Sequence, residues 1–459
     1  MIWTTRQLAD ITDGILHADP EAQVTGISTD TRSLRAGDAF VAIVGEQFDG
    51  ADFAAAAMAA GAAVVIAERE LDVPSIVVHD AQRALAMIAR AHLDTLSNTT
   101  VVAITGSSGK TSTKDLVAQV LQRAGTTVAA TGSFNNEIGL PRTVLSANTE
   151  TRFLVLEMGM RGLGHIAHLC EIAPPDVAAV LNIGTAHIGV VGSRDGIANA
   201  KSEILEALGT DGVAVINGDD QYADLLRSKT AARVLEFGVD SGDVYASDLV
   251  LDALARPAFR LHIGSTSAPV QLRLIGEHHV ANALAAAAMA SACGMDVATI
   301  ANALSDAKPQ SRWRMEYHEL SNGVTVINDA YNANPESMRS ALRALAVMGR
   351  HRRTWAVLGE MRELGDLSMD EHDAIGRLAV RLDISHLVAI GDMGKIMQMG
   401  AAHEGSWGDE AAHVPTPEAA VQYVTARWQP GDVVLVKASR SIGLDRVAQA
   451  LIDAGTGED

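Results

Sequence analysis

The pattern of hydrophobic and polar positions changes at two points along the chain, near residues 97 and 310. Before the first point, short apolar runs alternate with alanine-rich segments of helical length. The spacing predicts helices at 4–13, 51–60 and 81–96 and strands at 39–43, 62–67 and 75–78. A polar stretch over residues 97–100 ends this part and marks a domain boundary.

Between the two points, strongly apolar strands alternate with helices. The apolar runs lie at 101–105, 153–157, 177–183 and 212–216, and segments with helical spacing separate them. This alternation is typical of a parallel, doubly wound sheet. We expect a polar antiparallel excursion over 231–275 and a closing helix at 278–293.

A second alternating series begins after residue 310. Its strands are expected at 324–328, 354–358, 387–390 and 433–436, with helices between them. At 459 residues the chain also exceeds what one hydrophobic core usually organises. The sequence therefore predicts an α/β protein of three domains, at 1–97, 98–310 and 311–459.

Composition and charge restrict the possible partners. The formal net charge of −20 argues against nucleic acid or an anionic membrane surface as the main partner. Two cysteines, Cys170 and Cys293, are too few for a disulfide framework and lack metal-site spacing. The longest apolar run, 54–67, is too short for a membrane span, and the first residues do not form a signal peptide. We expect a cytoplasmic monomer with no integral membrane segment, acting on small molecules.

A glycine-containing loop follows the predicted strand at 101–105 and opens a helix. In that setting, backbone N–H groups converge on an anion at the positive helix end. Lys110 would neutralise terminal phosphates and the Thr111 hydroxyl would coordinate Mg²⁺. The spacing departs from the strict pattern, because Ile104 stands where the first glycine is expected; a glycine turn with a surface lysine is the alternative. The loop residues are Gly106, Ser107, Ser108, Gly109, Lys110 and Thr111.

Two later strands of the same sheet end in polar residues that suit such a site. Glu157 ends the strand at 153–157, and His187 follows the strand at 177–183. Since the carboxyl ends of these strands line the ligand crevice, both should converge near Thr111 as Mg²⁺ ligands. The alternative for His187 is a loop histidine in a local hydrogen bond. Lys201, near a helix start, is by its spacing alone a surface residue.

Polar clusters follow strands of the third domain as well. The segment 328–335, Asn-Asp-Ala-Tyr-Asn-Ala-Asn-Pro, has more amide and acid groups than a turn needs. Such groups can bind ribose hydroxyls, order water around magnesium or hold an amino-acid substrate. The segments 359–366 and 437–441 also follow strands; the first of these could equally be an ordinary turn, and the second supplies basic groups.

Taken together, these motifs resemble the Mur ligase family over essentially the whole chain. The segments that carry the resemblance are 105–111, 157–159, 186–187, 200–201, 276–282, 328–335, 359–365 and 436–441. Residues 28–32 are similar to the family's UDP-substrate loop. The resemblance implies an N-terminal domain for a UDP-sugar peptide, a central ATPase-like domain and a C-terminal Rossmann-like domain.

The resemblance also implies a reaction. D-alanyl-D-alanine would be joined to UDP-N-acetylmuramoyl-tripeptide, a peptidoglycan precursor, while ATP becomes ADP and phosphate. The tripeptide carboxylate would attack the γ-phosphate, and the amine would attack the resulting acyl phosphate. Lys110, Glu157, His187 and Lys201 would form the catalytic centre, with Mg²⁺ held by Thr111, Glu157 and His187. By resemblance, Lys201 would be carbamoylated and bind a second Mg²⁺.

Further roles follow from matching positions with the family. Contacts to the nucleotide or its metals are implied for Asn135, Asn136, Asn282, Arg314 and Asp329, with Arg312 the alternative to Arg314. Substrate contacts are implied for Ser28, Thr29, Asp30, Thr31, Arg32, Asp49, Asn332 and Asn334. At position 279 this chain has histidine where related ligases often have asparagine.

Other functions remain as alternatives. A folylpolyglutamate-synthetase-like ligase would not need the UDP-type loop at 28–32, and the diamino-acid-adding Mur ligase would differ at 328–335. A P-loop kinase or nucleotide hydrolase would not need a third α/β domain with an amide-rich loop. A non-catalytic nucleotide-binding module would not need Lys110, Thr111, Glu157, His187 and Lys201 together.

Overall fold

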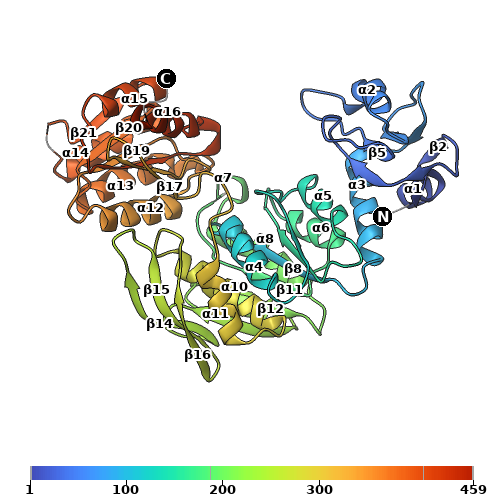
Figure 1. The fold of residues 1–459 in the computed structure, drawn as a ribbon, viewed down its shortest axis with the longest axis horizontal. Coiled ribbons are helices and arrows are strands. Elements are labelled where there is room, and N and C mark those ends of the chain that lie inside the picture. Colours follow the sequence, from blue (N-terminus) through green and yellow to red (C-terminus); the bar gives the residue numbers. More distant parts are fainter. Residues whose placement is uncertain (1–2, 187, 407, 457–459) are drawn as a thin grey trace.

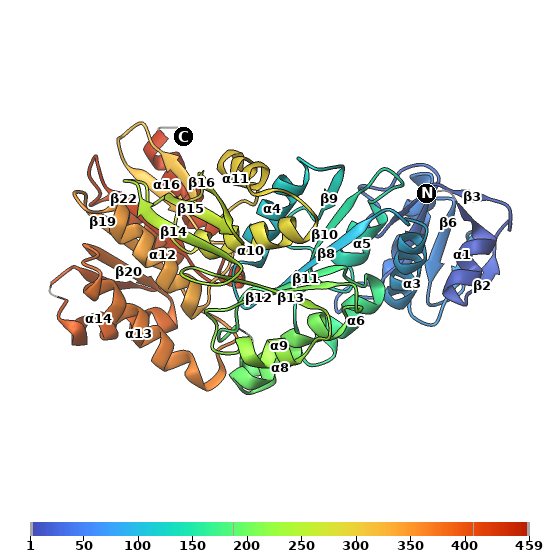
Figure 2. The same cartoon turned by 90° about the horizontal axis from the view of Figure 1, so that it is seen from below.

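The computed structural model describes residues 3–186, 188–406 and 408–456. Three α/β regions follow one another along the chain, and the N- and C-terminal regions lie at opposite ends of the central one (Figures 1 and 2). Each region is built on its own sheet, as the alternating pattern of the sequence predicts. No helix among the described residues has the length and apolar character needed to cross a membrane.

The N-terminal region has a sheet in the order β2-β7-β6-β5-β4. Strands β4 to β7 pair in parallel, and β2 pairs antiparallel with β7. The predicted helix at 51–60 begins as a 3-10 turn, Gly50–Phe53. The other elements are β1 Trp3–Thr4, α1 Thr5–Thr12, β2 Ile15–His17, β3 Gln23–Val24, β4 Gly26–Ser28, β5 Asp38–Val41, α2 Ala54–Ala59, β6 Val64–Ala67, β7 Ser75–Val77 and α3 Ala81–Asp94.

Helix α3 contributes to two hydrophobic cores. Its side chains Leu85 and Ile88 lie in the core of the N-terminal sheet. One turn further on, Ala89 and Leu93 lie in the core of the central sheet. Because one continuous helix is buried in both, the N-terminal region is joined to the central region through packed side chains.

The central sheet has the order β16-β15-β14-β13-β12-β11-β8-β10-β9. The excursion predicted over 231–275 is antiparallel only in its later part, because β13 pairs in parallel with both β12 and β14. Strands β13 and β14 pair over only two residue pairs, between the end of β13 and the start of β14. A short loop is therefore enough to connect them, and no crossover helix is needed. The strands are β8 Thr100–Thr105, β9 Thr127–Ala129, β10 Phe153–Glu157, β11 Val177–Val180, β12 Val213–Asn217, β13 Arg233–Gly238, β14 Val244–Leu251, β15 Pro257–Ile263 and β16 Thr266–Gln271.

Helices cover both faces of the central sheet (Figure 2). On one face lie α4 Lys110–Leu121, α10 His279–Ala292 and α11 Val297–Asp306. On the other lie α5 Gly139–Leu145, α6 His165–Ile172, α7 Ile188–Val191, α8 Arg194–Glu206 and α9 Ala223–Ser228. Helix α10 is buried along nearly its whole length, and its run of alanines lets it approach both the sheet and α4 closely.

The C-terminal sheet has the order β17-β18-β22-β19-β20-β21. The predicted strands are present, and β17 and β21 extend the two edges, β17 in antiparallel. The elements are β17 Glu316–Glu319, β18 Thr325–Asn328, α12 Pro335–Met348, β19 Thr354–Leu358, η2 Gly365–Leu367, α13 Ser368–Arg381, β20 His386–Ile390, α14 Asp392–Glu404, β21 Ala411–Val414, α15 Pro417–Thr425, β22 Val433–Lys437, η3 Arg440–Ile442 and α16 Asp445–Thr456.

Asp432 holds the start of β22, the strand that leads to Lys437. Its buried carboxylate accepts hydrogen bonds from Trp355 Nε1 at 2.8 Å and from the Gln429 amide at 2.9 Å. It also forms an ion pair with Arg353 at 2.8 Å. The carboxylate therefore fixes the beginning of a central strand of the C-terminal sheet.

We predict that Asp432→Ala lowers the free energy of unfolding of the C-terminal region by about 2–4 kcal/mol, because buried donors lose their acceptor. Thermal unfolding followed by calorimetry measures this as a lower transition midpoint. Asp224→Ala, which removes a 97% exposed carboxylate, is the matched control and should leave the midpoint unchanged. Equal midpoints for both variants would contradict the prediction.

Candidate functional site

A cavity of about 650 Å³ lies between the central and C-terminal regions. The lining residues of the central region include those of the loop after β8, the end of β10 and the start of α10. C-terminal residues that line it follow β18 and β22, the strands that precede segments 328–335 and 437–441. The carboxyl ends of parallel strands from two sheets thus face one space, the position at which α/β sheets bind ligands.

The glycine loop closes tightly before α4. Lys110 Nζ donates a hydrogen bond to the Gly106 carbonyl at 2.7 Å, so the side chain curls over the loop. Gly109 has a φ of 81°, and a Cβ there would lie 2.5 Å from Asn282 Oδ1. Only glycine fits this position, which brings Asn282 against the loop. Burial lowers the pKa of Lys110, although the nearby Glu157 carboxylate acts in the opposite direction.

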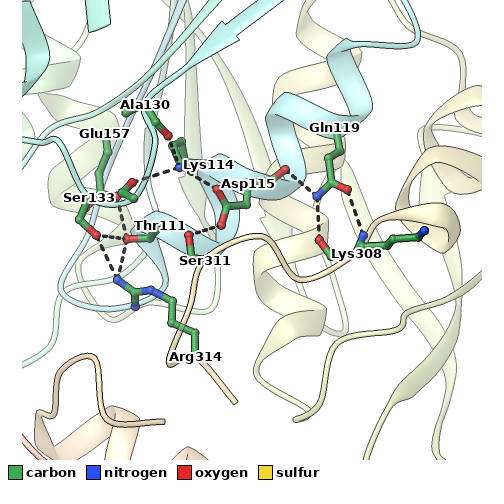
Figure 3. Close-up of polar contacts among 11 residues, drawn as sticks. Thr111, Lys114, Asp115, Gln119, Ala130, Ser133, Glu157, Lys308, Ser311 and Arg314 are labelled. Atoms are coloured by element: carbon green, nitrogen blue, oxygen red, sulfur yellow. Dashed lines mark hydrogen bonds and ion pairs between the residues drawn. The ribbon is translucent and has the colours of Figure 1, made fainter. Parts of the chain in front are cut away.

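The Thr111 hydroxyl is the meeting point of three segments (Figure 3). It donates to Glu157 Oε2 at 2.8 Å and lies 2.9 Å from Ser133 Oγ. Arg314 Nη2 donates to Thr111 Oγ1 at 2.8 Å and to Ser133 Oγ at 3.2 Å. The other oxygen of Glu157 accepts from Asn135 Nδ2 at 2.7 Å. Thr111, Glu157, Asn135 and Arg314 therefore converge as side chains.

The donor set around Thr111 fits a magnesium ion. A hydroxyl and a carboxylate are hard oxygen ligands, and Mg²⁺ in nucleotide sites usually takes one or two carboxylates plus water and phosphate oxygens. Among the described residues, no cluster of three or more His, Cys, Asp or Glu forms a dedicated metal cage. His187, the further ligand expected from the sequence, lies outside the described residues. Thr111 and Glu157 are the described side chains that such a site would use, together with water and phosphate oxygens.

Lys201 is fully buried on α8, so its interpretation from spacing as a surface lysine is wrong. Its Nζ has no hydrogen-bond partner within the described chain. Burial, and then the charge of Lys110, lower the pKa of Lys201 well below its ordinary range. The lysine shares the buried face of α8 with Ile197 and Ile204, four and three residues away, and this helical spacing is the signal that could have revealed its burial.

The segment after β18 reaches the glycine loop directly. Asp329 Oδ2 pairs with Lys437 Nζ at 2.6 Å, and that amine also donates to the Asn332 carbonyl at 2.8 Å. Asn334 caps α12 through its side-chain oxygen, while its Nδ2 donates to the Ser107 carbonyl at 3.3 Å. Residues of the 328–335 motif therefore do two things: they order the C-terminal edge of the cavity and they contact the phosphate loop.

The remaining expected residues divide between the cavity and the N-terminal region. Asn136 lines the cavity and accepts from the Gly139 amide at 2.9 Å, which starts α5. Ser28 to Arg32 and Asp49 do not line it and instead make local contacts. Hydrogen bonds from Arg32 lower the pKa of Asp30 to about 2. Arg312 is exposed, whereas Arg314 lines the cavity.

Asn182 lines the cavity but belongs to none of the sequence motifs. Asn182, after β11, accepts from the Ser108 amide at 2.9 Å and donates to the Ser108 carbonyl at 3.2 Å. His278 and His279, in the segment 276–282, also line the cavity; their rings are tilted with centroids 4.2 Å apart, and burial lowers the pKa of His278 to about 4. A single polar residue such as Asn182, within the predicted strand 177–183, has no repeating pattern that reveals a role in the site, and the strand itself ends at Val180.

Comparison with known proteins adds three family-model matches. The Mur ligase family catalytic domain matches residues 23–94, the Mur ligase middle domain 104–290, and the Mur ligase glutamate ligase domain 313–440. The chain is 46% identical to UDP-N-acetylmuramoyl-tripeptide–D-alanyl-D-alanine ligase of Mycobacterium tuberculosis, over 98% of this chain and 97% of that protein.

Solved structures of Mur ligases resemble this chain over nearly its whole length. A crystal structure of MurF from Acinetobacter baumannii is similar with a TM-score of 0.91 and 34% identity, over 99% of both chains. MurF from Thermotoga maritima, solved in complex with ADP, is similar with a TM-score of 0.82 and 30% identity, over 94% of this chain and 98% of that one.

A substitution at Asn182 tests whether this side chain orients Ser108 of the phosphate loop. We predict that Asn182→Ala weakens ADP binding about tenfold, because the Ser108 amide and carbonyl lose the side chain that orients them. Isothermal titration calorimetry measures the dissociation constant. Asn217→Ala is the matched control, since Asn217 donates to the Leu181 carbonyl at 3.0 Å and does not line the cavity. Unchanged affinity in Asn182→Ala, or equal losses in both variants, would show that Asn182 has no such role.

Proposed function

Because the chain belongs to the Mur ligase family, we propose that it uses ATP to join D-alanyl-D-alanine to UDP-N-acetylmuramoyl-tripeptide. The observation that supports this most directly is the 46% identity along 98% of the chain to a ligase of that name. The chain is thus an ATP-dependent peptide ligase of peptidoglycan synthesis. The cavity between the central and C-terminal regions is the proposed site of the reaction.

The first chemical obstacle is repulsion between two anions, the tripeptide carboxylate and the triphosphate. Lys110 and Arg314 both lie where they can offset that charge, one curled over the loop and one at Thr111. The carboxylate oxygen bonds to the γ-phosphorus and the bond to the β-phosphate oxygen breaks, giving an acyl phosphate and ADP. The amine of D-alanyl-D-alanine then attacks the acyl carbon, loses a proton, and inorganic phosphate leaves.

Thr111 and Glu157, with His187, are the residues we assign to magnesium. When bound there, Mg²⁺ would neutralise the terminal phosphates of the nucleotide. Asn135 would hold the Glu157 carboxylate in place through its 2.7 Å hydrogen bond. Asn282, which lies against Gly109 of the loop, and Asn136 and Asp329, which also line the cavity, are assigned to the nucleotide.

Lys201 is assigned a modified state. Its buried amine, with a lowered pKa and no partner in the described chain, favours the neutral form that reacts with CO₂. The neutral nitrogen would bond to the CO₂ carbon and release one proton, which converts a buried neutral amine into a carbamate anion. That product would suit a site where Lys110 is already close.

The N-terminal region is assigned to the UDP part of the substrate through residues 28–32 and Asp49. Asn332 and Asn334, which line the cavity on its C-terminal side, are assigned to the peptide substrates. We further propose domain limits at 97 and 310, a monomeric state and a cytoplasmic location, all of which accord with small-molecule substrates.

Substrate dependence tests the function as a whole. With ATP and Mg²⁺, purified protein should release phosphate only when UDP-N-acetylmuramoyl-tripeptide and D-alanyl-D-alanine are both present, because the amine is needed to turn over the acyl phosphate. A coupled phosphate assay and mass spectrometry of the pentapeptide product measure this. Equal phosphate release without D-alanyl-D-alanine would identify a hydrolase instead.

Lys201 is tested by chemical rescue. Lys201→Ala should lower kcat on the order of 100-fold, the size of loss expected when one charge-stabilising group leaves an active site. Formate or acetate should restore part of the rate, since a small carboxylate can occupy the space of the carbamate. Lys395→Ala, at an exposed lysine, is the control. Full activity in Lys201→Ala would refute the assignment, and a loss without rescue would refute the carbamate.

A further inference from the structure

One face of α4 contacts the linker of residues 307–315, which connects α11 to β17 (Figure 3). Gln119 accepts from the Lys308 amide at 3.0 Å and donates to the Lys308 carbonyl at 3.1 Å. One turn nearer the phosphate loop, Asp115 Oδ2 accepts from Ser311 Oγ at 2.6 Å. Residues four apart on a helix share one face, so the linker lies along a single stripe of α4.

The third contact on that stripe is the hydrogen bond from Arg314 to Thr111 in the site. The linker therefore runs antiparallel to α4: residue 308 contacts residue 119, residue 311 contacts 115, and residue 314 contacts 111. The linker runs along α4 toward the end at which the nucleotide phosphates are expected. Ser311 is the last point of attachment before the residue that enters the site.

Asp115 is itself held by a buried ion pair. Lys114 Nζ lies 2.7 Å from Asp115 Oδ1, and the Lys114 side chain is 2% exposed. The same amine donates to the Ala130 carbonyl at 2.5 Å and the Gly132 carbonyl at 3.1 Å. One ion pair therefore fixes two segments that both reach Thr111: the loop that carries Ser133 and the linker that carries Arg314 (Figure 3).

The backbone on either side of Arg314 is strained. Trp313 and Met315 have φ values of 59° and 51°, a left-handed conformation that costs a non-glycine residue roughly 1–2 kcal/mol. Such residues persist only where surrounding contacts determine them. On the C-terminal side these contacts are the Tyr331 amide to the Trp313 carbonyl at 3.1 Å and the Met315 amide to Asp329 Oδ1 at 3.1 Å.

We propose that Asp115 and Ser311 are positioning residues of the ligase reaction. By holding the linker on α4 they keep the strained turn in place, so that the Arg314 guanidinium stands at the phosphate end of the cavity. This inference rests on the proposed function, and it adds a residue pair that touches no substrate. Nucleotide affinity then depends on a contact between the linker and α4, one turn of helix away from the phosphate loop.

Ser311→Ala is the selective test, because it removes the linker contact and leaves the Lys114–Asp115 ion pair intact. We expect the KM for ATP and the dissociation constant of ADP to rise about three- to tenfold, the effect of one lost hydrogen bond. The KM for the UDP-tripeptide and the unfolding midpoint should stay at wild-type values. Ser311→Thr, which keeps a hydroxyl, should restore nucleotide affinity. Ser305→Ala removes a hydroxyl that donates to the Ala301 carbonyl and accepts from the Gln271 amide, away from the linker, and is the matched control.

A double-mutant cycle separates positioning from general loosening. In an Arg314→Lys background, Ser311→Ala should cause no further loss of ADP affinity, because its effect passes through the guanidinium. Additive losses, a wild-type ADP affinity in Ser311→Ala, or a lowered unfolding midpoint would each overturn the proposal. ADP binding by calorimetry does not require turnover. A protein that fails the substrate-dependence assay yet shows this coupling would refute the proposed function and keep the positioning role.

Discussion

The hydroxyl of Thr111 is the point on which the arrangement of the site depends. It lies in the first turn of α4, where unpaired backbone N–H groups and the helix dipole favour an anion. Glu157 from β10, Ser133 from the preceding loop and Arg314 from the linker all contact it. Three separate segments are thereby placed around a single oxygen atom. The position of each segment limits where the other two can lie.

Burial of positive charge is the second constraint, and it explains why the site suits anionic substrates. The chain as a whole has a net charge of −20, yet Lys110, Lys201, Arg314 and Lys437 surround or approach one cavity. Lys437 is compensated by Asp329, and Arg314 shares the Thr111 hydroxyl with Glu157, but Lys201 Nζ has no hydrogen-bond partner in the described chain. Uncompensated charge in a protein interior is costly, which is why the pKa of Lys201 falls. Phosphate and carboxylate groups would supply the missing negative charge.

Much of the fold could be predicted from the sequence, because repeated apolar strands and helical spacing are strong, local signals. The strands at 153–157 and 354–358 have the expected bounds, and the loop at 106–111 was recognisable from its strand–loop–helix setting. The site was less accessible. The hydrogen bond from Asn334 to Ser107 joins residues 227 positions apart, and that from Arg314 to Thr111 joins residues 203 apart. Such contacts depend on how two sheets face each other, which no local pattern encodes, and residues 28–32 lie at the end of β4 in a third sheet and in the turn that follows it.

The contacts between the central and C-terminal regions show why the linker and the phosphate loop cannot be considered separately. Glu336, at the start of α12, accepts from the Thr185 amide at 2.9 Å and from its hydroxyl at 3.0 Å. Together with Asn334 on Ser107, this fastens one side of the C-terminal region to the loops after β8 and β11. A second attachment is the hydrogen bond from Arg314, in the linker that leads into the C-terminal region, to Thr111 of the central region. Both attachments end on the loops expected to hold the nucleotide, so the C-terminal edge of the cavity is positioned relative to the phosphates. If the amine is presented from that edge, nucleotide binding and amine positioning depend on the same few contacts.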